Sequence, residues 1–253
     1  MIKTMPLIYE PAGRAREYAA LACNIYRGCD HACEYCYAPA AIRMDREAFS
    51  HPAPRPDFLP TLRREAAKLA PTGPILLCFT CDPYQTLDER LGITRETIKI
   101  LHAAGHAVHI LTKGGSRALR DADLLGKRDA FATTLTLLDE AESLAREPGA
   151  ATPADRIATI REMHRLAIPT WVSLEPVLDP AVALAIIRLT APDVDLFKVG
   201  RWNYDARAKE IDWAKFATDA VALLESLGKR YYIKKDLACF LPEGHEVRSN
   251  TAA

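Results

Sequence analysis

Short apolar runs alternate with longer amphipathic runs along most of the chain. The apolar runs fit β-strands at residues 19–25, 74–80, 106–112, 130–137, 169–175, 194–200 and 231–235. The amphipathic runs fit helices at residues 57–70, 94–105, 116–125, 152–167, 179–190 and 212–228. Strands that alternate with helices in this way predict parallel strands joined by right-handed helical crossovers.

Residues at the helix ends support these boundaries. Thr94, Thr152 and Asp179 stand where an N-cap is expected, because their side-chain oxygens can accept a hydrogen bond from a free N–H of the first turn. Gly105 follows the helix at 94–105 and is expected to end it, since glycine readily adopts the left-handed conformation found there.

The alternation predicts an α/β fold, a partial (βα)6 TIM-like barrel of about six units with parallel strands inside and helices outside. We expect residues 1–240 to form this barrel and residues 241–253 to form a C-terminal tail. In parallel α/β folds, functional side chains lie at the carboxyl ends of the strands. The residues that follow each strand are therefore the candidates for chemistry.

The charge balance and the hydropathy of the chain give no support to broad nucleic-acid binding or to a membrane-spanning helix. Lys and Arg total 33, as do Asp and Glu, so the formal net charge is zero. Broad nucleic-acid binding usually needs a basic excess, so it gains no support from composition. No apolar run reaches the ~18 residues of a membrane helix, and the first residues lack a signal-peptide pattern. We therefore expect a cytoplasmic protein with no membrane partner, where clustered cysteines bind metal or do chemistry more often than they form disulfides.

Three cysteines lie within eight positions of one loop, at Cys29, Cys33 and Cys36. A structural zinc site needs four ligands, and His31 is an awkward fourth because it lies inside the loop. A catalytic zinc with three cysteines and a water stays open. A [4Fe–4S] cluster normally takes four thiolates. Three thiolates would leave one iron free to bind a small molecule.

The loop "GCDHACEYCYAP" resembles the cluster loop of the radical S-adenosylmethionine (SAM) superfamily, which carries an aromatic residue, here Tyr35, before its third cysteine. Within it, residues 10–39, 80–101 and 110–115 look most like the spore photoproduct lyase-like group. The resemblance implies that the three cysteines hold three irons of a [4Fe–4S] cluster and that SAM chelates the fourth. One electron from a flavodoxin- or ferredoxin-type reductant would then cleave SAM, giving methionine and a 5′-deoxyadenosyl radical that takes hydrogen from a substrate.

The resemblance also implies residues for SAM. Asp82 is the expected partner of the SAM ammonium, although before a proline it is also suited to capping a turn. Lys113 is expected to pair with the SAM carboxylate, the alternative being a solvated lysine. Thr134 and Thr136 share a strand face and are expected at the ribose or the methionine end, unless they serve only as strand formers. The backbone of Tyr35 is expected near adenine.

The residues that follow the later strands are the candidates for substrate binding. Glu175 is expected to bind SAM ribose hydroxyls or substrate, the alternative being a cap or a salt bridge. An aromatic ring beside a guanidinium can stack a base and hold a phosphate, although an ordinary packed loop contains the same residue types. After the strand at 194–200, the candidate substrate-binding residues of these types are Arg201, Trp202, Asn203 and Tyr204. In the lyase a cysteine near this position donates hydrogen, but aligning Asp82 with the lyase motif puts that donor position at Phe79. Cys81 shares a strand face with Phe79 and is the candidate donor here, whereas a buried inert thiol is the more usual role of a free cysteine.

Three functions stay open from sequence. The first is a radical SAM enzyme acting on a nucleic-acid lesion or base. The second is a radical SAM enzyme acting on a peptide or a small metabolite. The third is a zinc-binding protein without radical chemistry.

Overall fold

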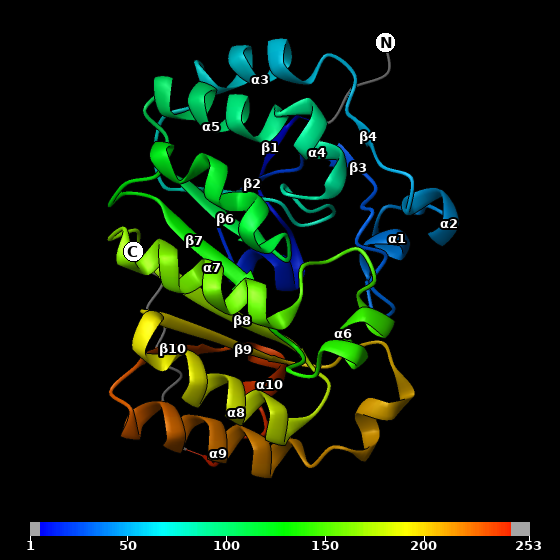
Figure 1. Ribbon diagram of the computed structural model, residues 1–253, viewed down its shortest axis with the longest axis vertical. Coiled ribbons are helices and arrows are strands. Elements are labelled where there is room, and N and C mark those ends of the chain that lie inside the picture. The colour runs from blue at the N-terminus through cyan, green and yellow to red at the C-terminus, as the bar shows by residue number, and fades with distance from the viewer. Residues whose placement is uncertain (1–5, 244–253) are drawn as a thin grey trace.

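A computed structural model describes residues 6–243, and its centre is one eight-stranded sheet (Figure 1). All pairings are parallel except the antiparallel pair β1–β2. In spatial order the strands are β1 (Ile8–Tyr9), β2 (Leu21–Cys23), β5 (Ile75–Leu77), β6 (Val108–Thr112), β7 (Ala130–Thr134), β8 (Thr170–Val177), β9 (Leu196–Arg201) and β10 (Arg230–Ile233). Seven parallel strands joined by six crossovers confirm the predicted partial barrel.

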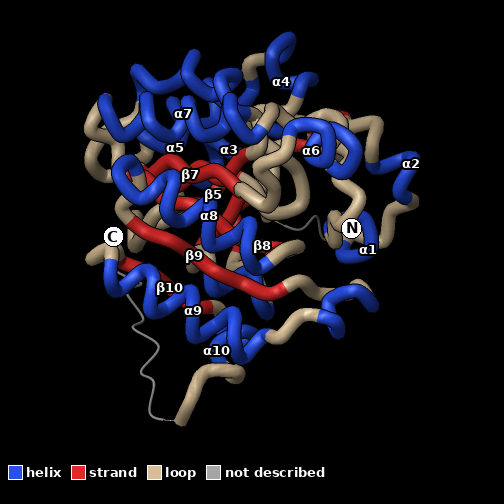
Figure 2. The backbone as a smooth tube through the Cα atoms, turned by 60° about the horizontal axis from the view of Figure 1, so that its bottom comes forward, coloured by secondary structure: helices blue, strands red, loops and turns tan. Residues whose placement is uncertain are grey.

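Helical crossovers cover the outside of this sheet, and the strands run through the middle (Figures 1 and 2). They are α3 (Phe58–Ala66), α5 (Ile93–Ala103), the 3₁₀ helix η2 (Gly115–Leu124), α7 (Pro153–Arg165), α8 (Pro180–Thr190) and α9 (Trp213–Ser226). Thr152 and Asp179 cap α7 and α8 as predicted, each accepting hydrogen bonds from first-turn N–H groups.

Two expectations about these crossovers are wrong. Thr94 is not an N-cap, because α5 already begins at Ile93 after Gly92, which has φ of +61°. The Thr94 hydroxyl instead donates to the Pro83 carbonyl. The segment expected as an α-helix at 116–125 is the 3₁₀ helix η2. Gly105, with φ of +86°, does follow the end of α5.

Alternation along the strands separates two apolar regions. On β8, Val172 and Leu174 belong to the main core under the helices. Trp171 points to the opposite face, into a small cluster inside the barrel with Ala22, Leu76, Ala130 and Ala132. Because side chains alternate along a strand, Ser173 and Glu175 share the inner face with Trp171. The inner face is therefore apolar at one end of the barrel and polar at the carboxyl end.

The barrel is open between its edge strands β1 and β10, and an N-terminal segment bridges them. The 3₁₀ helix η1 (Gly13–Glu17) lies between β1 and β2 in sequence. The carboxylate of Glu17 accepts hydrogen bonds from the Tyr232 hydroxyl and the Lys235 N–H at the far edge, both at 2.8 Å. Sequence patterning did not predict η1 or this contact.

The cysteine loop is pinned at its base by a two-stranded ribbon, β3 (Tyr26–Arg27) with β4 (Ala53–Pro54). Between them lie the short helices α1 (Ala38–Ala41) and α2 (Arg46–Phe49). The hydrophobic pattern does not predict these four elements, nor α4 (Thr86–Leu91), α6 (Glu140–Arg146) and α10 (Lys235–Ala238).

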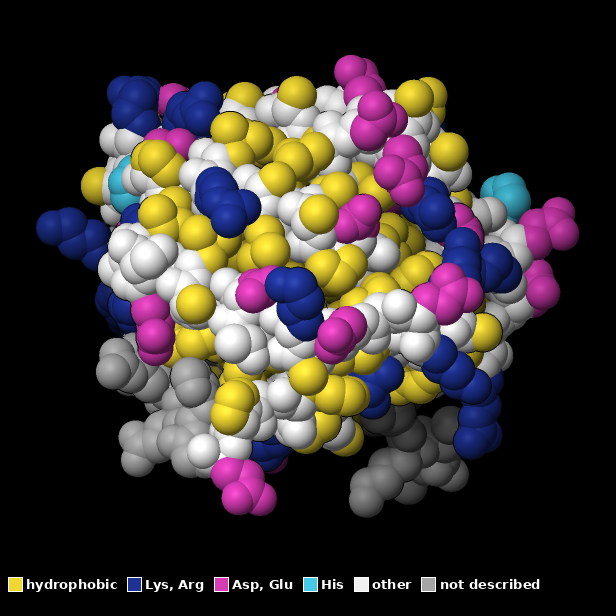
Figure 3. All heavy atoms as spheres, turned by 90° about the horizontal axis from the view of Figure 1, so that it is seen from below, with side chains coloured by type: hydrophobic (Ala, Val, Ile, Leu, Met, Phe, Trp, Pro, Cys, Tyr) yellow, Lys and Arg dark blue, Asp and Glu magenta, His cyan; other side chains and the backbone are white. Residues whose placement is uncertain are grey.

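Acidic and basic side chains are interspersed on the face in Figure 3, as expected from the balanced charge. Within residues 6–243, no helix is long and apolar enough to cross a membrane. Of the expected C-terminal tail, residues 244–253 lie outside the described residues.

Candidate cofactor site

A cavity of about 460 Å³, the main cavity, lies at the carboxyl ends of the parallel strands. Each parallel strand from β5 to β10 contributes a lining residue at or near its carboxyl end, as the barrel prediction requires. These residues are Cys78, Lys113, Thr134, Glu175, Arg201 and Lys234. The cysteine loop closes one side of the cavity.

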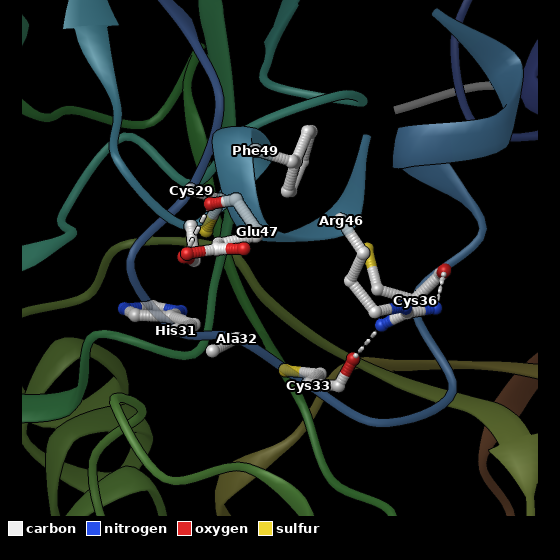
Figure 4. Close-up of a pocket in the computed structure, with 9 residues that line it drawn as sticks. Cys29, His31, Ala32, Cys33, Cys36, Arg46, Glu47 and Phe49 are labelled. Atoms are coloured by element: carbon white, nitrogen blue, oxygen red, sulfur yellow. Dashed lines mark hydrogen bonds between the residues drawn. The ribbon is translucent and has the colours of Figure 1, made fainter. Parts of the chain in front are cut away.

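The three loop cysteines line the main cavity together with a second one. That second cavity, the outer cavity, measures about 440 Å³ and lies against α2 (Figure 4). Cys29 and Cys33 are 9% and 8% exposed, Cys36 is half-buried, and all three are free thiols. Among residues 6–243, no three His, Cys, Asp or Glu side chains form a site for a single metal ion.

The donor set fits a [4Fe–4S] cluster with one open iron. Three thiols border one space, and both ring nitrogens of His31 already face protein groups, so His31 is not directed as a fourth ligand. Burial raises the pKa of Cys33 to about 12 and raises the pKa values of Cys29 and Cys36. Bound iron would supply the positive charge that keeps these thiols deprotonated.

Two glycines let the loop take this shape. Gly28 has φ of +95°, and a Cβ there would lie 2.6 Å from the Phe49 carbonyl oxygen. A Cβ on Gly149, between α6 and α7, would lie 2.1 Å from the Asp30 carbonyl oxygen. The loop therefore packs directly against backbone on two sides.

Asp82 lines the main cavity, but groups of the chain occupy its carboxylate. One oxygen accepts from the Tyr84 N–H at 2.8 Å and the Thr112 hydroxyl at 2.6 Å. The other accepts from the Lys113 N–H at 2.7 Å and lies 3.4 Å from Nδ1 of His31. The turn-capping alternative is thus directly observed. A SAM ammonium would have to share this carboxylate, so that role stays a prediction.

His31 links the cysteine loop to these groups. It is 2% exposed, and burial lowers its pKa to about 4, outweighing the nearby Asp82 charge. The ring is therefore neutral at physiological pH. From its position in the loop, His31 is a candidate only as a metal ligand, and nothing in its spacing indicates a contact with Asp82, about fifty positions away.

Lys113 and Thr134 are available to a ligand. The Lys113 ammonium makes no hydrogen bond or ion pair with the described residues and lies 5.5 Å from the Tyr35 ring centroid. Thr134 is 6% exposed, lines the cavity, and its hydroxyl has no hydrogen-bond partner within residues 6–243. Both positions suit the predicted contacts to SAM, which stay predictions.

Thr136 and the Tyr35 hydroxyl belong instead to a buried network below the loop. Glu147 accepts hydrogen bonds from Thr136 at 3.0 Å and from Tyr35, and it pairs with the buried Arg156. Thr136 is not among the residues lining the main cavity. β7 ends at Thr134, so the strand face that Thr134 and Thr136 were expected to share does not extend to Thr136. Of the two threonines, Thr134 is the one that lines the main cavity, and a contact of either with SAM stays a prediction.

Glu175 lies at the opposite wall in a second polar network. Its Oε2 accepts from the Tyr18 hydroxyl and pairs with the Lys234 ammonium, each at 2.6 Å. Tyr18 also hydrogen-bonds Ser173 at 2.8 Å. A Cβ on Gly200 would lie 2.8 Å from Cδ of Glu175, so glycine makes room for this pair. The salt-bridge alternative for Glu175 is observed, and its contact with Tyr18 has no signal in the sequence.

The four predicted substrate residues all line the main cavity, but three are engaged elsewhere. The Arg201 guanidinium lies 5.3 Å from the Trp213 ring and 5.4 Å from the Phe240 ring. Trp202 is buried under Arg207, and Asn203 donates to Asp236 at 2.8 Å. Tyr204 is 87% exposed, and the Arg14 guanidinium lies 5.4 Å from its ring.

Cys81 lines the main cavity and is half-buried, with Cys78 beside it. The Cys81 thiol is close enough to raise the pKa of Cys78, which burial already raises most. Cys81 is therefore accessible from the main cavity, and its role as a hydrogen donor stays a prediction.

The fold and the three-thiol site define a cofactor-dependent barrel, and comparison with known proteins supplies its family. The model of the radical SAM superfamily matches residues 23–182. The chain therefore belongs to the radical SAM superfamily, whose members use a [4Fe–4S] cluster and SAM. This confirms the predicted family and its cofactors.

Two curated relatives share part of the chain. An uncharacterized protein of Mycobacterium tuberculosis is 29% identical over 166 residues, which cover 61% of this chain and 48% of the relative. An uncharacterized protein of Methanocaldococcus jannaschii is 23% identical over 168 residues, covering 65% and 62%. The chain spans about half the length of the mycobacterial relatives it matches.

Solved structures show the same fold. A spore photoproduct lyase mutant with bound AdoMet and dinucleoside spore photoproduct has a TM-score of 0.65 and 14% identity, over 86% of this chain and 76% of the lyase. Streptococcus suis SuiB bound to S-adenosylmethionine has a TM-score of 0.63 and 13% identity, over 88% and 52%. The predicted likeness to the lyase is confirmed for the fold.

Proposed function

We propose that this protein is a radical SAM enzyme that removes a hydrogen atom from a substrate bound at the carboxyl end of its barrel. The observation that carries this proposal is the meeting of three free thiols and one uncommitted ammonium, Lys113, at one cavity. When bound, the cluster and SAM supply the one-electron chemistry that generates the abstracting radical.

The chain's own residues position and shield these reactants. Cys29, Cys33 and Cys36 would hold the cluster, and Lys113 would attract the SAM carboxylate by charge. Thr134 would hydrogen-bond the ribose or the methionine end. Cys81 would give its thiol hydrogen atom to the product radical from the cavity wall, and one electron from the proposed flavodoxin- or ferredoxin-type reductant plus a proton would restore the thiol.

For the substrate we propose a nucleic-acid lesion or base. The exposed Tyr204 ring beside Arg14 provides an aromatic surface and a positive charge at the cavity, a combination that binds single bases by stacking. The solved lyase complex, which has dinucleoside spore photoproduct bound, supports the same class. The neutral net charge suits contact with a few nucleotides more than binding along a duplex.

A peptide or small metabolite is the second candidate substrate. The Glu175–Lys234 pair places one negative and one positive group at the cavity wall, which matches the two charges of an amino-acid-like ligand. SuiB has also been solved bound to a precursor peptide. A one-electron reductant of the flavodoxin or ferredoxin type is the proposed partner, and the cytoplasm is the proposed location.

Anaerobic reconstitution with iron and sulfide tests the proposal. We expect about four irons per chain and, with SAM and dithionite, formation of 5′-deoxyadenosine. Cys33→Ala should lose both, whereas Cys239→Ala, an exposed cysteine outside the site, should keep both. A colourless protein holding zinc, or cleavage retained in Cys33→Ala, would refute it.

The substrate class is tested on the same preparation. Spore photoproduct dinucleotides, short single-stranded oligonucleotides and unmodified peptides are each supplied, and extra 5′-deoxyadenosine is measured. A nucleic-acid substrate should stimulate cleavage in the intact protein and less so in Tyr204→Ala. Stimulation by peptide alone would move the assignment to the second candidate.

A further inference from the structure

The outer cavity has a wall made by α2, and one side chain of that wall is bonded to the cysteine loop. The Arg46 guanidinium donates to the Cys33 carbonyl at 2.9 Å and to the Cys36 carbonyl at 3.0 Å (Figure 4). Asp45 caps α2 and so fixes the backbone from which Arg46 extends. Arg46 makes no ion pair with any residue in the described part of the chain.

The two bonds hold the spacing between two cysteines. Each is made by a different nitrogen of a planar group whose donors have a fixed separation, so together they restrain the two carbonyls relative to each other. Lysine offers a single ammonium on a flexible stem and cannot reproduce this restraint. The backbone of two expected cluster ligands is therefore fixed from outside the loop.

The same contact places a permanent positive charge beside the loop. One-electron reduction of a [4Fe–4S] cluster from the 2+ to the 1+ state adds one negative charge, which a nearby cation favours. Glu47 also lines the outer cavity and carries the opposite charge near Cys29 (Figure 4). Arg46 thus favours one-electron reduction of the cluster, and the neighbouring Glu47 opposes it.

We propose that Arg46 is a positioning residue that fixes the backbone of Cys33 and Cys36 and raises the reduction potential of the cluster they hold. The inference rests on the proposed function, since it requires the cluster. Groups around iron–sulfur sites tune their potentials through charge and hydrogen bonds to the ligands. Here the residue that does so comes from α2, outside the cysteine motif.

The test measures the midpoint potential of the reconstituted cluster by titration with dithionite, followed by electron paramagnetic resonance without SAM or substrate. Arg46→Gln should shift the potential to more negative values, and Glu47→Gln should shift it to more positive values. Arg46→Lys keeps the charge, so its potential should stay near the wild type while its cluster is lost faster to a chelator. Arg43→Gln removes an arginine of the same segment that, within the described residues, makes no hydrogen bond to the cysteines and does not line the outer cavity, and it should leave both readouts unchanged.

Opposite shifts from neighbouring residues separate electrostatics from general damage, which would move both variants the same way. Unchanged potential in Arg46→Gln, or a shift of the same sign in Glu47→Gln, would overturn the inference. If Arg46→Gln holds no cluster, Arg46→Lys and Glu47→Gln still decide it. A wild-type protein that binds no cluster would instead refute the proposed function.

Discussion

At the residue scale, Lys113 is a cation at the cavity wall with no acidic partner among residues 6–243. Its ammonium is close enough to lower the pKa of Cys33 against the larger raising effect of burial. Its own backbone N–H is fixed by Asp82. A charge held in place beside an expected cluster ligand, and left unpaired, is suited to an anionic group of a ligand.

Lys113→Met should weaken SAM binding to the reconstituted protein by about 10-fold or more, because a hydrogen bond to a charged group contributes about 1.5–3 kcal/mol. Lys215→Met is the matched control, since Lys215 is exposed and pairs with Asp219. Equilibrium binding of SAM measures both. Equal affinities in the two variants would place the SAM carboxylate elsewhere.

Residue types and spacing were enough to predict the cysteines and the cavity positions of Asp82, Lys113 and Thr134. They were not enough to predict what each side chain does with its hydrogen-bonding capacity. Asp82 is the clearest case, since its partners come from the cysteine loop, from β6 and from its own turn. Such contacts depend on which strands become neighbours, which a single sequence does not show.

At the scale of elements, the site depends on backbone contacts between the cysteine loop and the segment that joins α6 to α7. Gly149, between α6 and α7, donates its N–H to the His31 carbonyl at 3.1 Å. A Cβ at this position would lie 2.8 Å from Cα of His31 as well as 2.1 Å from the Asp30 oxygen. Both contacts are to backbone, so no side-chain rotation can relieve them.

Gly149→Ala should push the cysteine loop away and lower the iron bound per chain after reconstitution. Overpacking of this kind typically costs about 1–3 kcal/mol of unfolding free energy. Gly126→Ala is the control, because the nearest atom to its added Cβ would be 4.0 Å away. Iron analysis and urea unfolding check the two variants, and full iron content in Gly149→Ala would contradict the expected displacement.

Hydrophobic periodicity predicted the seven parallel strands and most crossovers, because each of those elements buries an apolar face against the sheet. It missed η1, β3, β4 and the short helices of the cysteine loop. These elements are two to five residues long and are held by specific polar contacts, such as Glu17 to Tyr232. Segments that short contain fewer than two periods of a helix or strand pattern, too few for a periodicity to be recognised.

At the scale of the whole molecule, the inside of the barrel contains charge as well as apolar packing. The Lys198 side chain extends from β9 toward the aromatic rings of Tyr18 and Trp171, and its ammonium lies 4.6 Å from the Trp171 ring centroid. The same ammonium donates a hydrogen bond to the Tyr18 carbonyl at 2.9 Å. Burial, and secondarily the charge of Lys234, lowers its pKa to about 8. The Lys198 ammonium is therefore less stable, relative to the neutral amine, in the folded protein than in the unfolded chain.

This predicts a pH-dependent stability. Between the folded pKa of about 8 and the usual value of 10.5, the unfolded chain binds more protons at Lys198, so its contribution to stability rises as pH increases. The unfolding free energy of the wild type minus that of Lys198→Met should grow across this range, on the order of 2 kcal/mol given partial solvent exposure. Lys229→Met serves as the control. Urea titrations at several pH values measure the difference, and a constant difference would contradict the prediction.

Cys29, Cys33 and Cys36 border two cavities, the outer one beside α2 and the main one inside the barrel mouth. These thiols would hold the cluster of the proposed function. Under that proposal, an electron donor that docks against α2 would not compete for space with SAM and substrate in the main cavity. The kinetics then expected are random-order, with either reduction or substrate binding coming first.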